Sequence, residues 1–172
     1  MRTRILLLLG IFMALFSFSK GEPLNVGAQA PALTGTTETG ASLNLGDVYK
    51  KGLTLVYFYP KADTPGCTAQ GCSLRDSYEV LQQKGVTVIG ISRDSVAAQE
   101  AFKQKYHLPF TLIADTKGEF THAFGQPDKA FASRQAFLID RDGKIVWRDL
   151  QGHTKDQADQ VLAELKTLQP QA

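Results

Sequence analysis

The two cysteines of the chain lie five residues apart, directly after an apolar run that predicts a buried strand. Cys67 and Cys72 are the only cysteines among the 172 residues. Residues 53–59 are rich in β-branched and aromatic side chains, and residues 60–66 contain the proline and glycine residues typical of a loop. Two thiols in one turn region indicate redox chemistry.

The segment that carries the first cysteine has the start signals of a helix. Thr64 followed by Pro65 predicts an N-cap and a first helical residue, so Cys67 falls in the first turn of a helix expected over residues 65–83. Backbone N–H groups and the helix dipole favour an anion there. Making an ordinary thiol mostly anionic at neutral pH takes roughly 2.7 kcal/mol, whereas a helix end supplies at most about 2 kcal/mol. A further donor or cation is therefore needed, and the Thr64 hydroxyl can donate locally.

The spacing of the cysteines separates two kinds of redox chemistry. Residues five apart in a regular helix have Cα atoms about 8.6 Å apart, whereas a disulfide requires less than about 7 Å. Cys67 and Cys72 therefore cannot bond while the helix is intact, and Gly71, which costs a helix about 1 kcal/mol relative to alanine, favours local unwinding. This pattern predicts a thiolate that a peroxide oxidises to sulfenic acid and that a second thiol then attacks.

At these residues the chain resembles the peroxiredoxins, and among them the Q type, also called the bacterioferritin-comigratory type. The P-x-x-x-T-x-x-C core of that family is matched by Pro60, Thr64 and Cys67, and its resolving cysteine by Cys72. The resemblance continues through residues 74–76, 86–92 and 134–140, and it spans about residues 23–168.

The resemblance implies a thiol-dependent peroxidase that reduces hydrogen peroxide and organic hydroperoxides. It implies that Cys67 is the peroxidatic cysteine, that Cys72 is the resolving cysteine, and that Thr64, following Pro60, hydrogen-bonds peroxide and thiolate. It also implies that Arg134 is the cation beside them. By composition alone, four other arginines are equally available: Arg75, Arg93, Arg141 and Arg148.

The implied cycle needs no cofactor. It passes through an intramolecular disulfide, is recycled by thioredoxin or a thioredoxin-like reductant, and runs in a monomer. The sequence gives no reason to add a metal or a nucleotide, because His107, His122 and His153 lack ligand spacing and no glycine-rich phosphate loop is present.

The N-terminus has the three parts of a secretory signal peptide. Arg2 and Arg4 precede an apolar run over residues 5–18, and the small residue Ser19 follows it. This run is shorter than the about 20 residues of a membrane span. We therefore expect cleavage near Ser19 and a periplasmic protein, with an uncleaved anchor as the alternative.

Loss of residues 1–19 removes two arginines and lowers the formal net charge from +2 to 0. A neutral domain gives no reason to expect nucleic acid or an anionic membrane as a partner.

Residues 20–172 are expected to form a single α/β domain. Strand–helix–strand units followed by a hairpin at Asp142-Gly143 and a last helix predict a mixed central sheet flanked by helices, which is the thioredoxin-like architecture of the family that the chain resembles. The expected strands are residues 53–59, 86–92, 111–114, 135–140 and 144–149. The other expected helical segments are residues 95–106, 118–124 and 155–168, after a hairpin near residues 35–42.

Two alternatives belong to other functional classes. An exported thiol-disulfide oxidoreductase acting on protein disulfides would share fold and compartment, but such proteins usually carry a C-x-x-C pair that this chain lacks. A non-catalytic binding domain would carry structural or incidental cysteines, which show no peroxide-sensitive thiol.

Overall fold

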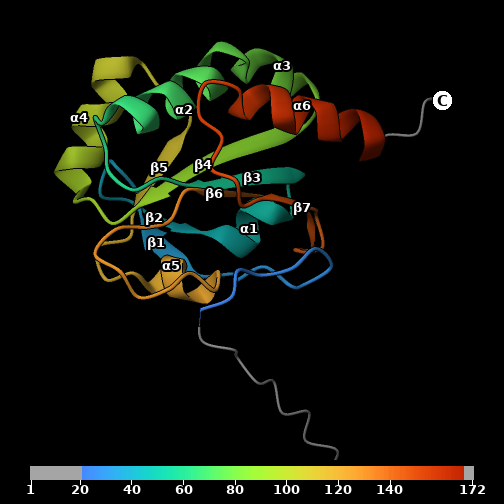
Figure 1. The fold of residues 1–172 in the computed structure, drawn as a ribbon, viewed down its shortest axis with the longest axis horizontal. Coiled ribbons are helices and arrows are strands. Elements are labelled where there is room, and N and C mark those ends of the chain that lie inside the picture. The colour runs from blue at the N-terminus through green and yellow to red at the C-terminus, as the bar shows by residue number, and fades with distance from the viewer. Residues whose placement is uncertain (1–20, 169–172) are drawn as a thin grey trace, which may run out of the picture.

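A mixed five-stranded sheet forms the middle layer of the protein, in a computed structural model that describes residues 21–168 (Figure 1). In sheet order the strands are β5 (Thr111–Ala114), β4 (Val86–Ser92), β3 (Leu53–Phe58), β6 (Gln135–Ile139) and β7 (Ile145–Asp149). The pairs β3–β4 and β4–β5 are parallel, whereas β6 is antiparallel to both β3 and β7. The predicted mixed central sheet is confirmed.

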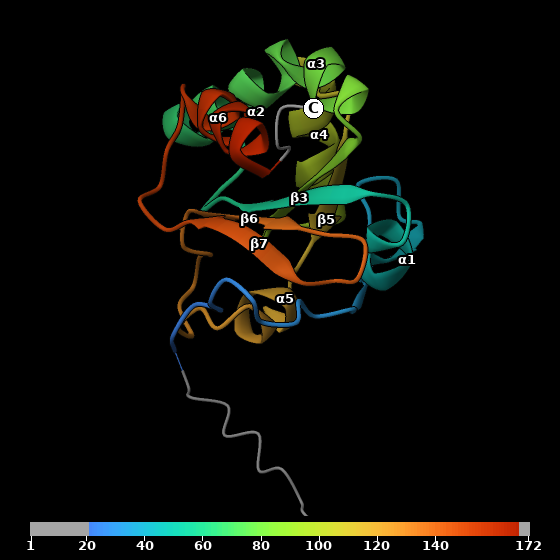
Figure 2. The same ribbon diagram turned by 90° about the vertical axis from the view of Figure 1, so that its right-hand side faces the viewer.

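Helices cover both faces of this sheet (Figure 2). One face carries α2 (Pro65–Asp76), α3 (Tyr78–Gln83), α4 (Val96–Tyr106) and α6 (Gln157–Leu168). The opposite face carries α1 (Leu45–Tyr49) and α5 (Glu119–Ala123). A separate hairpin of β1 (Thr34–Thr36) and β2 (Ser42–Asn44) precedes α1.

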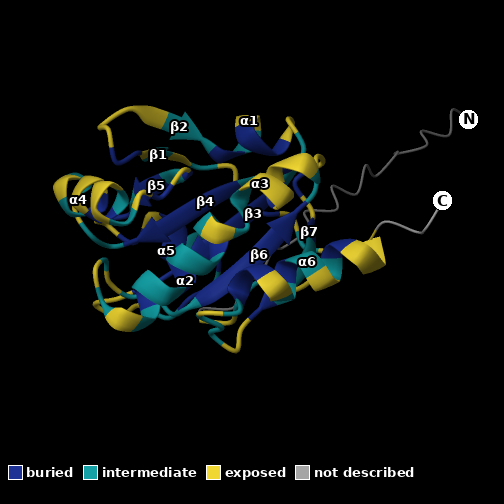
Figure 3. Ribbon diagram, turned by 90° about the horizontal axis from the view of Figure 1, so that it is seen from above, coloured by how far each residue is buried: buried dark blue, intermediate teal, exposed yellow. Residues whose placement is uncertain are grey.

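The central strands contribute to a core on each face of the sheet. Successive side chains of a strand point to opposite faces. Leu55 and Tyr57 of β3 therefore join the core under α2, α4 and α6, while Val56 and Phe58 join the core under α1 and α5. Figure 3 shows the buried sheet between helices whose outer faces are exposed. Burial on both faces explains why β3 and β4 are continuous apolar runs.

The expectation of one helix over residues 65–83 is wrong, because the chain breaks at Ser77 into α2 and α3. Ser77 has φ −104° and ψ 7°, outside the helical range. Leu74 and Leu81 lie seven residues apart and are both buried in the same core, so the apolar pattern continues across the break. Periodicity alone therefore cannot reveal the break.

The single-turn helix α1 is not predicted from the sequence. Its local signal is Asn44, whose side chain accepts a hydrogen bond from the backbone N–H of Asp47 at 3.2 Å. The remaining predicted strands and helices agree with the structure to within two residues at each end.

The predicted signal segment, residues 1–19, lies outside the described residues. Within residues 21–168, no helix combines the length and the hydropathy needed to cross a bilayer.

Candidate active site

Three strand ends meet at one edge of the sheet. Phe58, the last residue of β3, pairs with Gln135, the first residue of the antiparallel strand β6. Ala136 pairs with Asp149, the last residue of β7. The loop that leaves β3, the residue that precedes β6 and the end of β7 are therefore neighbours, although they are far apart in the sequence.

The first turn of α2 begins at this edge and holds Cys67. Thr64 is the N-cap and Pro65 the first helical residue, as predicted, and the Cys67 side chain is almost fully buried. Nη2 of Arg134, the residue before β6, donates a hydrogen bond to Cys67 Sγ at 3.4 Å. The N-terminus of α2 and the guanidinium both place positive charge beside this sulfur.

The guanidinium of Arg134 is held by two further acceptors. Its Nη1 donates to Gln70 Oε1 at 2.6 Å and to the carbonyl oxygen of Gly66 at 3.4 Å. A Cβ added at Gly66 would lie 3.0 Å from Arg134 Nη2, so glycine at this position allows the close approach. The structure thus brings Arg134 to the position that the family resemblance implies.

The Thr64 hydroxyl has a different partner from the predicted one. It donates to the carbonyl oxygen of Lys61 at 2.8 Å and does not cap the helix. A hydroxyl has one proton, so the same group cannot donate to the Cys67 thiolate in this arrangement. Threonine side chains commonly form such local bonds to the backbone, which explains the difference.

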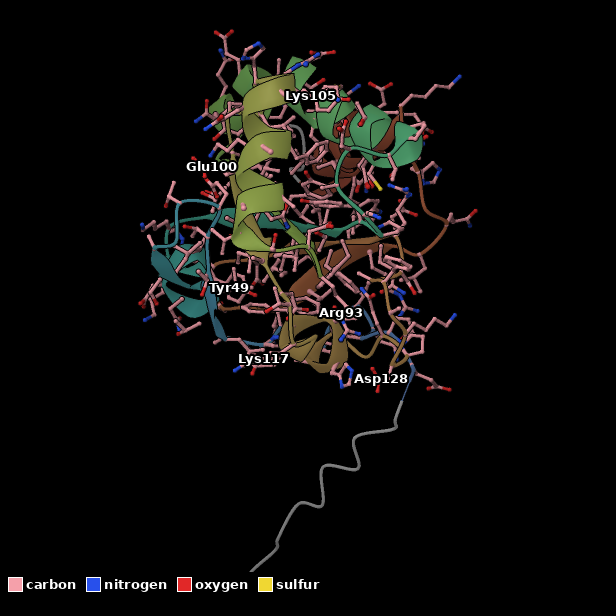
Figure 4. The ribbon with its side chains drawn as sticks, turned by 90° about the vertical axis from the view of Figure 1, so that its left-hand side faces the viewer. Tyr49, Arg93, Glu100, Lys105, Lys117 and Asp128 are labelled. Carbon is pink, nitrogen blue, oxygen red and sulfur yellow. The ribbon has the colours of Figure 1, made fainter. Side chains whose placement is uncertain are left out.

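The loop from Pro60 to Thr64 is fixed by two carboxylates. Asp94 Oδ2 accepts a hydrogen bond from the backbone N–H of Ala62 at 2.8 Å. Asp63 binds Lys105 Nζ at 2.7 Å and the Tyr106 hydroxyl at 2.6 Å, and Figure 4 shows Lys105 at the end of α4. The hydrogen bonds from Lys105 and Tyr106 lower the pKa of Asp63. The stability that this contact contributes is therefore present at neutral pH and is lost only as the pH falls through the lowered pKa.

The segment that leads into Arg134 is also tied down. Arg93 Nη1 donates to the carbonyl oxygen of Lys129 and lies 3.6 Å from the Asp128 carboxylate, beside α5 in Figure 4. Further along, Gln126 Oε1 accepts a hydrogen bond from the backbone N–H of Ser133 at 2.7 Å. These contacts fix the chain just before the arginine.

The second cysteine lies in the following turns of the same intact helix. Cys72 is half-buried, and both cysteines are free thiols. Gly71 packs against the core under α2, where an added Cβ would lie 3.5 Å from the Leu108 methyl groups and 3.6 Å from the Phe102 ring. The geometry requires α2 to unwind before Cys72 can reach Cys67.

Comparison with known proteins gives the family of this chain. A model of the AhpC/TSA family matches residues 26–148. The chain belongs to this family.

Relatives within the family are peroxiredoxins. The chain is 44% identical over 135 residues to a putative peroxiredoxin bcp of Coxiella burnetii, covering 72% of this chain and 88% of that protein. It is 41% identical to the chloroplastic peroxiredoxin Q of Suaeda salsa, covering 69% of this chain and 56% of that protein. The chain thus spans little more than half the length of this plant relative.

Solved structures of peroxiredoxins share the fold. A peroxiredoxin Q variant from Xylella fastidiosa matches with a TM-score of 0.80 at 28% identity, covering 86% of this chain and 99% of that chain. Peroxidoxin BcpB from Mycobacterium tuberculosis matches with a TM-score of 0.78 at 26% identity, covering 84% and 98%. The predicted thioredoxin-like fold and Q-type resemblance are confirmed, and this peroxiredoxin is a thiol-dependent peroxidase.

One residue of the site is not identified by the sequence analysis. Gln70 lies three residues after Cys67, on the same side of α2, and binds Arg134. Its spacing from Cys67 is a signal that could have found it.

Within residues 21–168 of this peroxiredoxin, no group of three or more His, Cys, Asp or Glu residues could hold a metal ion.

Replacing Arg134 with methionine should slow oxidation of Cys67 about 10²-fold, since the change removes the charged donor aimed at the reacting sulfur. Stopped-flow measurement of the second-order rate constant with hydrogen peroxide checks this. Arg141→Met, at an exposed arginine on the β6–β7 turn, is the matched control. An Arg134 variant that reacts as fast as this control would contradict the role.

Replacing Gly71 with alanine should slow disulfide formation about fivefold without slowing oxidation of Cys67. The added methyl group fits in ordinary contact with Leu108, and alanine stabilises the intact helix by about 1 kcal/mol, which unwinding must overcome. Rapid-quench thiol trapping after a stoichiometric peroxide pulse measures both steps. Equal or faster disulfide formation would show that α2 does not unwind at Gly71.

Proposed function

We propose that this peroxiredoxin reduces hydrogen peroxide and organic hydroperoxides in two steps. The peroxide first oxidises Cys67, and Cys72 then forms a disulfide with it. The observation that carries the proposal is the 3.4 Å contact of Arg134 Nη2 with Cys67 Sγ at the N-terminus of α2. One solved structure similar to this chain is described as addressing alkyl peroxide reduction by a Xanthomonas campestris bacterioferritin comigratory protein, which supports organic hydroperoxides as substrates.

In the first half-reaction, the Cys67 thiolate attacks the terminal oxygen of the hydroperoxide. The O–O bond breaks, Cys67 becomes a sulfenic acid, and the other oxygen leaves as an alcohol or as water after taking a proton. Arg134 stabilises the negative charge that develops on the leaving oxygen. Thr64 assists by hydrogen bonding once its hydroxyl turns away from Lys61.

In the second half-reaction, α2 unwinds locally and the Cys72 thiolate attacks the sulfenic sulfur of Cys67. An S–S bond forms, the S–O bond breaks, and the hydroxide leaves as water. An external dithiol of thioredoxin type then returns both thiols by exchange and is itself oxidised to a disulfide. Because both cysteines lie in one helix, a monomer suffices.

The proposal includes export to the periplasm, supported by the signal-like pattern of residues 1–19. Disulfides persist outside the cytosol, so the cycle needs a dedicated reductant in that compartment. N-terminal sequencing of the native protein tests the cleavage near Ser19. A protein that begins at residue 1 would contradict it.

Mass spectrometry after a stoichiometric pulse of peroxide tests the peroxidase cycle. A sulfenic acid trap should label Cys67 at early times, and a peptide pair linked through Cys67 and Cys72 should accumulate later. Peroxide consumption by the protein with thioredoxin as reductant should exceed insulin reduction by the protein measured without thioredoxin. If Cys67 stays unmodified, or insulin reduction is the faster activity, the proposal is wrong.

A further inference from the structure

A chain of side-chain hydrogen bonds leads from Arg134 away from the reacting sulfur to the start of α6. Arg134 Nη1 donates to Gln70 Oε1 at 2.6 Å. Gln70 Nε2 donates to Gln157 Oε1 at 2.8 Å, and Gln157 Nε2 donates to Asp149 Oδ2 at 3.3 Å. Gln157 is the first residue of α6 and Asp149 the last residue of β7. We call these three residues, Gln70, Gln157 and Asp149, the amide relay.

The two ends of the amide relay determine its direction. A carboxylate can only accept hydrogen bonds and a guanidinium can only donate them. Asp149 therefore turns the NH₂ group of Gln157 toward itself, which leaves Gln157 Oε1 facing Gln70. Gln70 in turn presents its NH₂ group to Gln157 and its oxygen to Arg134. Each amide has one orientation that satisfies both of its neighbours.

Because the amide relay is buried, each of its side chains depends on its protein partners for hydrogen bonds. Gln70 and Gln157 are fully buried and Asp149 is only 4% exposed. Water cannot readily replace a lost partner, so a broken link leaves a buried polar group unpaired. The Asp149 carboxylate is itself fixed by the backbone N–H of Gln151 at 2.8 Å, and His153 Nδ1 lies 2.9 Å from its Oδ2.

We propose that Gln157 and Asp149 are positioning residues for the peroxidase reaction, which act through Gln70 to hold the Arg134 guanidinium against Cys67 Sγ. The inference rests on the proposed function, since it assigns residues to the first half-reaction. With Nη1 held by the relay, Nη2 of the same planar group faces the sulfur. Without the relay, the guanidinium keeps its charge but loses its fixed direction.

Replacing Gln157 with methionine removes both hydrogen-bonding groups of the side chain at nearly constant length. The rate constant for oxidation of Cys67 by hydrogen peroxide should fall about tenfold, as expected for a small misplacement of a reacting-site group. The pH at which oxidation reaches half its maximal rate should rise, because the thiolate loses part of its support. A change that affects packing alone would move the thermal unfolding midpoint but not this pH profile.

The matched control is Gln160→Met, the same substitution one turn later on α6 at a half-buried position. It should leave the rate constant and the pH profile as in the native protein. Asp149→Asn serves as a second test of the relay. The NH₂ group of asparagine would face another donor, either the Gln151 N–H or the donors of His153 and Gln157. The rate constant for oxidation of Cys67 should therefore fall, as it does for Gln157→Met.

A double-mutant cycle with Arg134→Met decides whether Gln157 acts through the arginine. In the Arg134→Met background, Gln157→Met should change the oxidation rate by less than about twofold. The inference is overturned if Gln157→Met reacts like the native protein, or if its tenfold loss persists without Arg134. Failure of the native protein to oxidise Cys67 at all would instead overturn the proposed function.

Discussion

Peroxide turnover should fall at least about 10⁴-fold when Cys67 is replaced by serine, the scale seen when an enzyme loses its nucleophile. Serine has nearly the same size and can accept the same hydrogen bond from Arg134, so the site should keep its shape. Its hydroxyl is not ionised near neutral pH and cannot be oxidised by a hydroperoxide as a thiolate is. Hydrogen peroxide consumption in excess dithiothreitol measures the loss.

Cys72 provides the internal control for this variant. It stays in place in Cys67→Ser and is the more exposed of the two thiols, so consumption above that of dithiothreitol alone reports the intrinsic reactivity of Cys72. Thermal unfolding of the variant should lie close to that of the native protein. Native-like peroxide consumption by folded Cys67→Ser would remove Cys67 from the mechanism.

Replacing Cys72 with serine should permit a single oxidation of Cys67 and then stop turnover supported by thioredoxin. The first half-reaction needs only Cys67 and its neighbours, so one equivalent of peroxide should disappear at the native rate. The sulfenic acid then lacks its internal attacking thiol, and excess peroxide should convert it to sulfinic acid. Burst kinetics followed by intact-mass measurement check both statements.

The control for Cys72→Ser is Ser73→Ala, the removal of a small polar group at the adjacent position of α2. Ser73 Oγ accepts a hydrogen bond from the backbone N–H of Ala158, so this variant also perturbs the helix but keeps both thiols. It should turn over continuously. Sustained turnover by Cys72→Ser would mean that the resolving thiol is supplied from outside the chain.

Local sequence features predict most of the first turn of α2. Thr64 and Pro65 mark the helix start, and the five-residue spacing of the cysteines excludes a disulfide within an intact helix. The strands β3, β4 and β6 are found because their burial on both faces leaves largely apolar runs. The break at Ser77 between α2 and α3 cannot be predicted in this way, because the apolar spacing of the helix continues across it.

The rest of the site depends on strand register. Arg134 reaches Cys67 because Gln135 pairs with Phe58, a pairing that no local pattern reveals, and only the family resemblance singles it out among the arginines. Gln157 and Asp149 are placed by the end of β7 and the start of α6. Glutamine and aspartate are common surface residues, so neither type signals a buried role in the sequence.

Gln70 lies between the two cysteines in α2, and this position affects the rate of the catalytic cycle. In the proposed cycle, joining Cys67 to Cys72 unwinds the turn that contains Gln70, so its contacts with Arg134 and Gln157 should be lost. The disulfide form would therefore lack both the Cys67 thiolate and the contacts that hold Arg134 in place. When peroxide is in excess, the rate of turnover should therefore be set by the supply of reductant.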